Sequence, residues 1–259
     1  MTAALFWAVT LAAAEAPKAA GNADADAWGT LKGQLVYGGP NVPEQKQLKV
    51  NKDEMHCLAK GPLLDHEWIV NKQNKGVKNV FVWLAADPNG PVKTLPIHPS
   101  LQAVPKESVL VDQPQCMFEP YASVMREGQS LIVKNSAPVA HNANYAGSQT
   151  KNPGANPIVP AGQQITISLK ADRFPVRLSC NIHPWMKGLV GVYNHPYYAL
   201  TDADGNFAIK LAPAGAFRLF VWHEGAGWRL GTEGSKGEPI TIKAKETTDL
   251  GKLPIQEAK

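Results

Sequence analysis

Short apolar runs interrupted by turn-forming residues dominate this chain, which contains 22 Gly and 21 Pro among 259 residues. Runs such as residues 109–111, 130–134 and 188–193 are rich in β-branched side chains and have the length of a β-strand. No long stretch has the 3.6-residue periodicity of an amphipathic helix. The sequence therefore predicts an all-β protein of the sandwich type, with helix as a minor component.

Length and charge limit the domain organisation and the partners. The chain is long enough for one large domain or two small ones. Its net charge of +4 is not concentrated in Lys/Arg-rich blocks, so no nucleic-acid partner is predicted. After the N-terminal region no segment approaches the roughly 20 apolar residues that a membrane-spanning helix needs. We therefore expect no membrane span.

The first 16 residues have the pattern of a secretory signal peptide. An apolar run from Ala3 to Ala14 is followed by Ala16, and small residues at this spacing fit a signal-peptidase site. No Lys or Arg precedes the run, so only the terminal amine supplies the usual positive charge. We expect export to the periplasm or the medium, with residues 17–27 as a linker.

Four candidate metal ligands occur in two segments. Cys180, His183 and Met186 follow one another at three-residue intervals between two predicted strands, and His141 follows an earlier strand-like run. Alternation along residues 176–180 directs the Cys180 thiol toward the core if that face is buried. A thiolate, two imidazoles and a weak axial thioether are the ligands of electron-transfer copper sites. The sequence therefore predicts one mononuclear copper ion.

Other interpretations of these four residues are less consistent with the pattern. Zinc sites normally use four strong nitrogen or sulfur ligands, and methionine is a poor one. The haem attachment motif Cys-x-x-Cys-His is missing. An enzyme that uses Cys180 as a nucleophile with His183 is not indicated, because a separation of three residues in a loop is no evidence of a thiolate oriented by a base, so we expect no enzyme. A copper-binding or structural β-sandwich module without electron transfer remains an alternative.

The segment from Val109 to Tyr193 resembles the cupredoxins and, among them, the amicyanins, which share the short Cys-x-x-His-x-x-Met spacing. The similarity includes Asn135, which opens the first histidine loop, and Asn142, which follows His141. Asn142 is also the natural candidate for a hydrogen bond that holds the ligand loops together. The resemblance implies a Greek-key β-sandwich with a type 1 copper ion.

The same resemblance implies a route for electrons. A one-electron carrier of this family contacts its redox protein partner through the partly exposed edge of the second histidine, here His183. The expected electron-entry patch around this edge consists of Pro138, Pro184 and Trp185. The partner's identity does not follow from the resemblance, because the flanking regions have no counterpart in amicyanins.

The flanking regions resemble the two halves of a transthyretin-like or carboxypeptidase-regulatory-like sandwich. Residues 33–39 and 77–84 look like its first strands, and residues 201–215 like a later hairpin. The copper domain would then be inserted into a split second sandwich. The expected divisions are a signal peptide (1–16), a linker (17–27), an N-terminal β region (28–107), the cupredoxin domain (108–194) and a C-terminal β-sandwich (195–259).

The remaining cysteines suggest a disulfide. With Cys180 assigned to the metal, Cys57 and Cys116 are the pair left to join in an oxidising compartment. The competing interpretation is a second metal site that uses His56, Cys57 and His66.

Polar residues after the predicted copper domain do not form a recognisable site. The sequence Asp202-Ala-Asp204-Gly205 lacks the spacing and the distant Glu of a calcium loop, so it predicts a plain turn. His195 and residues 222–224 could meet at a further ion. Nothing in the sequence places them together, and we expect structural roles.

Overall fold

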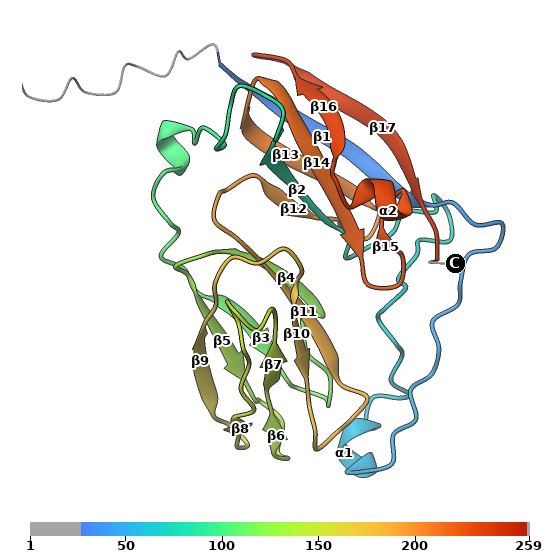
Figure 1. Ribbon diagram of the computed structural model, residues 1–259. Coiled ribbons are helices and arrows are strands. Elements are labelled where there is room, and N and C mark those ends of the chain that lie inside the picture. The colour runs from blue at the N-terminus through green and yellow to red at the C-terminus, as the bar shows by residue number, and fades with distance from the viewer. Residues whose placement is uncertain (1–26, 258–259) are drawn as a thin grey trace, which may run out of the picture.

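The computed structural model describes residues 27–257 and is nearly all β (Figure 1). In this part of the chain there are seventeen strands, the one-turn helices α1 (Glu54–Cys57) and α2 (Gly231–Gly234), and a 3₁₀ turn at Pro99–Leu101. No helix among the described residues has the length and apolar character needed to cross a bilayer. The all-β prediction is confirmed. The predicted signal peptide lies outside the described residues.

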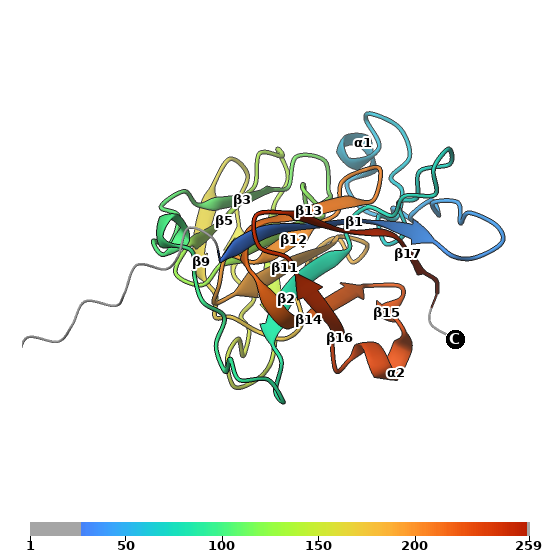
Figure 2. The same cartoon turned by 90° about the horizontal axis from the view of Figure 1, so that it is seen from above.

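Strands from both ends of the chain form one sandwich. They are β1 (Trp28–Tyr37), β2 (Phe81–Ala86), β12 (Tyr198–Leu200), β13 (Asn206–Pro213), β14 (Gly215–His223), β15 (Gly227–Trp228), β16 (Glu238–Ile242) and β17 (Thr247–Ile255). One sheet has the order β13-β1-β17, and the other has the order β12-β2-β14-β15 with β16 paired to β14. Figure 2 shows the two sheets as separate layers. Because β1 pairs with β13 and β2 pairs with β14, the segments that flank residues 109–193 fold together.

Alternating side chains build the core of this first sandwich. Leu31 and Leu35 of β1 and Phe217, Leu219 and Val221 of β14 are all buried in one cluster. Residues two or four apart on a strand point to the same face, so each sheet presents its apolar face to the other. The core therefore combines residues from the beginning and the end of the chain.

The predicted strand at 77–84 begins later than expected. Asn79 has a positive φ of 65°, a left-handed conformation that a strand residue does not adopt. Val77 is buried, but its N–H donates to the carbonyl of Leu35 outside the regular sheet (2.9 Å). The regular strand β2 consequently starts at Phe81.

The intervening residues form a second sandwich. Its strands are β3 (Val109–Asp112), β4 (Ala122–Arg126), β5 (Ser130–Lys134), β6 (His141–Asn142), β7 (Asn144–Ala146), β8 (Ile158–Val159), β9 (Gln164–Ser168), β10 (Val176–Ser179) and β11 (Lys187–Tyr193). The sheets have the orders β4-β11-β10-β7 and β3-β5-β9, and β6 pairs with β8. A separate buried cluster fills the space between these sheets.

Aromatic side chains join the two sandwiches. Trp83 of β2 lies against Tyr193 of β11 with ring centroids 5.5 Å apart, and both belong to a third buried cluster. Gly191 of β11 permits the close approach of Phe81 of β2, since a Cβ atom there would lie 2.9 Å from the ring of Phe81. The inserted sandwich is therefore packed directly on β2.

A long connection, residues 38–80, links β1 to β2, and we call it the strap. It runs from the first sandwich to the far end of the second, where it forms α1 beside the turn between β10 and β11, and then returns (Figure 1). A disulfide between Cys57 and Cys116 fastens it to the second sandwich, and the predicted pairing is confirmed. The strap is therefore held at both ends by β-sheet and near its middle by a covalent bond.

The returning half of the strap packs against His223 at the end of β14. The ring of Trp68 lies 4.3 Å from that of His223, and the Gly225 N–H donates to His223 Nδ1 (3.2 Å). The side chain of His223 is buried, and this burial lowers its pKa to about 4. His223 is therefore neutral at neutral pH.

Removal of the disulfide tests how much the strap contributes to stability. The two cysteines are 59 residues apart, and chain-entropy arguments give about 4 kcal/mol for a loop of this length. The double variant Cys57→Ala/Cys116→Ala should lose several kcal/mol in urea unfolding, and the wild type unfolded with reductant should show the same loss. A loss below about 1 kcal/mol would contradict this role.

Acid should weaken the fold through His223. In the unfolded chain His223 takes up a proton near its ordinary pKa of 6.5, whereas the folded protein takes it up only near 4. Between these two pH values the unfolded state binds more protons than the folded state. As the pH is lowered through this range, the free energy of unfolding therefore decreases by at most about 1.4 kcal/mol per pH unit. Urea unfolding at several pH values should show a shallower slope for His223→Gln. Parallel slopes for the two proteins would contradict the assignment.

Candidate metal centre

The four predicted ligands lie at one end of the second sandwich. His141 opens β6, Cys180 directly follows β10, and Met186 directly precedes β11. His183 lies in the tight turn between β10 and β11, and this turn is closed by a hydrogen bond from the Met186 N–H to the His183 carbonyl (3.0 Å). The paired strands β10 and β11 therefore hold both ends of the loop that carries three of the four residues.

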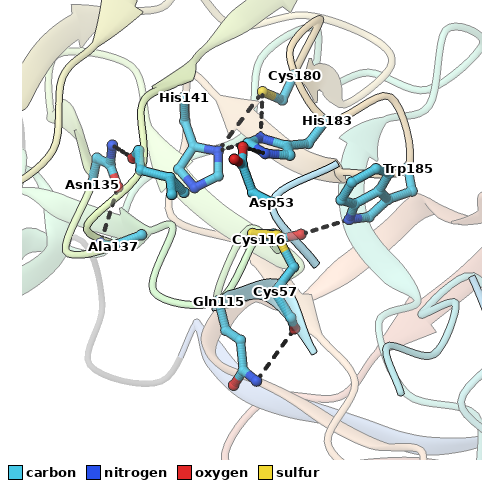
Figure 3. Close-up of a disulfide and its surroundings, with 11 residues drawn as sticks. Asp53, Cys57, Gln115, Cys116, Asn135, Ala137, His141, Cys180, His183 and Trp185 are labelled. Atoms are coloured by element: carbon cyan, nitrogen blue, oxygen red, sulfur yellow. Dashed lines mark hydrogen bonds and ion pairs between the residues drawn. A yellow bond between two sulfur atoms is a disulfide. The ribbon is translucent and has the colours of Figure 1, made fainter. Parts of the chain in front are cut away.

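Three donor atoms converge on one point (Figure 3). The Cys180 Sγ atom lies 3.9 Å from the Nδ1 atoms of both His141 and His183, and these nitrogens are 2.9 Å apart. The point in their plane that is equidistant from the three donor atoms lies about 2.1 Å from each. For comparison, the bonds from Zn²⁺ to imidazole and thiolate ligands are about 2.0–2.3 Å long. All three residues are buried. The residues present therefore fit a small transition-metal ion.

Met186 is completely buried in the same core cluster as Cys180. Its thioether is a weak ligand for soft metals. The loop therefore places a polarizable sulfur in the same buried cluster as the Cys180 thiol.

Asn142 connects the two ligand segments. Its Oδ1 atom accepts hydrogen bonds from the N–H groups of Asn181 (2.8 Å) and Ile182 (3.3 Å), and lies 3.4 Å from Cys180 Sγ. Its own N–H₂ group donates to Asn156. A single buried amide thus fixes the loop after Cys180 relative to the strand of His141.

Asn135 organises the segment that leads to His141. Its Nδ2 atom donates to the carbonyls of Val139 and Val159, both at 2.8 Å, and its Oδ1 atom accepts from the Ala137 N–H (3.0 Å). These hydrogen bonds supply partners for backbone N–H and C=O groups of a loop that has no regular secondary structure of its own. The position of His141 is therefore set before any metal binds.

Burial keeps both imidazoles neutral. It lowers the pKa of His141 to about 4, and the neighbouring His183 and His56 act in the same direction. Burial also lowers the pKa of His183, although the carboxylate of Asp53 opposes the effect. Imidazoles that are already neutral do not have to lose the extra proton of an imidazolium before a metal ion binds, whereas the thiol of Cys180 must still be deprotonated.

The expectation of a partly exposed His183 edge is wrong. The side chain of His183 is 0% exposed, and its Nε2 atom is 2.8 Å from Oδ2 of Asp53. Asp53 belongs to the strap, for which the family resemblance has no counterpart. Asp53 is 130 positions away from His183, and the predicted Cys57–Cys116 disulfide is the one feature of the sequence which indicates that the strap comes near the ligands.

The expected electron-entry patch is only partly at the surface. Pro138 and Pro184 are exposed. Trp185 is 8% exposed, and its indole N–H donates to the Cys116 carbonyl (3.1 Å). The tryptophan is therefore part of the contact between the strap's anchor and the ligand loop.

The other residues considered for metal binding do not form a second centre in the described part of the chain. Among the described residues, the only further cluster of donor atoms consists of Cys57, Cys116 and His183. Its two cysteines form the disulfide and therefore offer no thiolate to a metal ion. His66 lies against the ring of Tyr121. The Nδ1 atom of His195 accepts the Tyr197 N–H (3.1 Å).

No family model and no curated protein matches the chain. The solved structures to which it is similar include cupredoxins and a copper-containing enzyme. A purple cupredoxin from Nitrosopumilus maritimus matches 33% of this chain over 99% of its own, with 19% identity and a TM-score of 0.28. An oxidised amicyanin variant matches 33% of this chain over 81% of its own, with 22% identity and a TM-score of 0.29. A copper-containing nitrite reductase from Thermus scotoductus SA-01 matches 38% of this chain over 25% of its own, with 22% identity and a TM-score of 0.31.

Substitution of Asn142 tests whether the centre is preorganised without metal. Asn142→Ala leaves the Asn181 and Ile182 N–H groups without their acceptor, which should cost about 1–3 kcal/mol in urea unfolding of the apo-protein. Asn144→Ala is the matched control, because it removes only a side-chain hydrogen bond to Asn181 at the surface and should cost about 0.5 kcal/mol or less. Equal losses in the two variants would contradict the role of Asn142.

Proposed function

We propose that this protein is a periplasmic or secreted carrier of single electrons that holds one type 1 copper ion and catalyses no reaction of its own. The observation that carries the proposal is the convergence of Cys180 Sγ and the Nδ1 atoms of His141 and His183 on one buried point. Met186 would be the weak axial ligand. The ion would supply a one-electron couple.

The donor set favours copper over zinc. A thiolate stabilises copper in both valences, imidazoles suit either, and a weak thioether does not force the tetragonal geometry that Cu(II) prefers. Zinc would lack a strong fourth ligand, since Met186 is the remaining candidate. The chemistry of the four side chains therefore supports a redox-active ion.

The surrounding hydrogen bonds support electron transfer by limiting movement. Asn142 and Asn135 hold the two ligand segments through backbone groups, and the loop of Cys180 is closed between paired strands. Ligands that are held in place by outer hydrogen bonds keep their orientation when the charge of the metal changes. A small rearrangement on oxidation is what a carrier requires.

The surface around the ligands would receive the redox partner. Pro138 and Pro184 are exposed there, and Ile158, which pairs with Asn142, is 65% exposed. Exposed apolar residues that gather at a functional end often mark a docking surface. The Cys57–Cys116 disulfide is consistent with an oxidising compartment, which supports export.

A second candidate function is a copper-binding module that retains the metal without passing electrons. The complete burial of His183 favours this alternative, because no ligand edge is open to a partner. Both functions use the same ligands. They differ in whether the bound ion exchanges electrons rapidly and reversibly.

Copper loading and spectroscopy test the proposed function. Protein loaded with Cu(II) should show an intense visible band from thiolate-to-copper charge transfer, and Cys180→Ser should abolish this band while the circular dichroism of the fold is retained. Voltammetry of the loaded wild type should show a reversible one-electron wave. A visible band without a reversible wave would favour the retention module, and the absence of the band would refute the type 1 copper site.

A further inference from the structure

The strap makes a hydrogen bond to the metal centre through the side chain of Asp53. Oδ2 of Asp53 lies 2.8 Å from Nε2 of His183, on the ring atom that does not point at the common centre (Figure 3). His183 is 0% exposed, whereas the side chain of Asp53 is 35% exposed. Asp53 therefore stands between His183 and the solvent.

The backbone of Asp53 has an unusual conformation. Its φ of 49° and ψ of 34° lie in the left-handed region, which non-glycine residues adopt at a cost and which often marks functional sites. The residue occupies the N-cap position of α1, and its carbonyl accepts the N–H groups of His56 and Cys57. Aspartate is favoured at this position because its carboxylate usually caps the helix. Here the carboxylate makes no cap hydrogen bond and is directed to His183 instead.

The segment that carries Asp53 is anchored on the ligand loop from a second side. Cys57 is bonded to Cys116, and the Cys116 carbonyl accepts the indole N–H of Trp185 (3.1 Å). The Trp185 ring in turn lies 5.2 Å from the ring of His183. The strap thus contacts His183 directly through Asp53 and indirectly through Trp185.

We propose that Asp53 is a positioning residue that orients His183 for the metal and closes this side of the centre to solvent and to partners. When Nδ1 of a histidine binds a metal, Nε2 carries the proton and donates it to an outer partner, which fixes the ring. Asp53 provides this acceptor. An electron on its way to or from a partner then crosses the strap or enters at another face, instead of passing through an exposed edge of His183.

The closing role can be measured in the metal-free protein. Diethyl pyrocarbonate modifies accessible neutral imidazoles, and peptide mass spectrometry reports the rate at each histidine. His183 should be protected in the wild type and in Asp53→Asn, whose amide oxygen still accepts from Nε2–H, and should react at least tenfold faster in Asp53→Ala. Glu54→Ala is the matched control, because it removes the neighbouring carboxylate, for which the structure shows no contact with His183.

The orienting role is measured with copper and rests on the proposed function. Loss of an outer-shell acceptor typically costs about 10–100-fold in metal affinity, so Asp53→Ala should bind Cu(II) at least tenfold more weakly than the wild type and Glu54→Ala. Asp53→Asn removes a negative charge near the copper ion and should therefore raise its reduction potential. Each tenfold change in the ratio of the affinities for Cu(I) and Cu(II) would appear as a shift of 59 mV, because one electron is transferred.

The outcomes separate the two proposals. If wild-type protein gives no visible copper band, the proposed function fails, and the modification rates of the apo-protein still decide whether Asp53 closes the site. If Asp53→Ala leaves the modification rate of His183 unchanged, the closing role is overturned. If copper binds to the wild type and to Asp53→Ala with equal affinity, the orienting role is overturned.

Discussion

The pairing of β1 with β13 and of β2 with β14 is the constraint on which the rest of the structure depends. Because the first and last parts of the chain share one core, everything between them must leave this sandwich and return to it. Residues 109–193 do so as a second sandwich, packed on β2. The strap does so as an extended connection whose ends are fixed by β1 and β2, so that its middle can reach the far end of the molecule.

Much of the centre could be predicted because its information is local. Cys180, His183 and Met186 lie in one seven-residue segment, and His141 was recognisable from its position after a strand-like run. The all-β architecture followed from short β-branched runs and turns. The Cys57–Cys116 disulfide was reached by elimination, since the chain has three cysteines and one was assigned to the metal.

The features that could not be predicted depend on contacts between distant segments. The hydrogen bond between Nε2 of His183 and the carboxylate of Asp53 joins residues 130 positions apart, and no periodicity in the strap indicates it. The exposure of His183 was inferred from a resemblance that does not include the strap, so the inference missed the contact that the strap makes with His183. Similarly, the late start of β2 arises from the left-handed conformation of Asn79, which an apolar run does not reveal.

The aromatic contact between the sandwiches has a consequence for how this protein can be divided. Tyr193 on β11 and Tyr121 before β4 are buried together with Trp83 of β2, so the inserted unit uses a wall that the host sandwich supplies. Excision of residues 108–194 as an independent module would uncover this wall and would also cut the disulfide loop. The metal centre is therefore embedded in a two-part scaffold, and grafting it elsewhere would require a substitute for both the wall and the anchor.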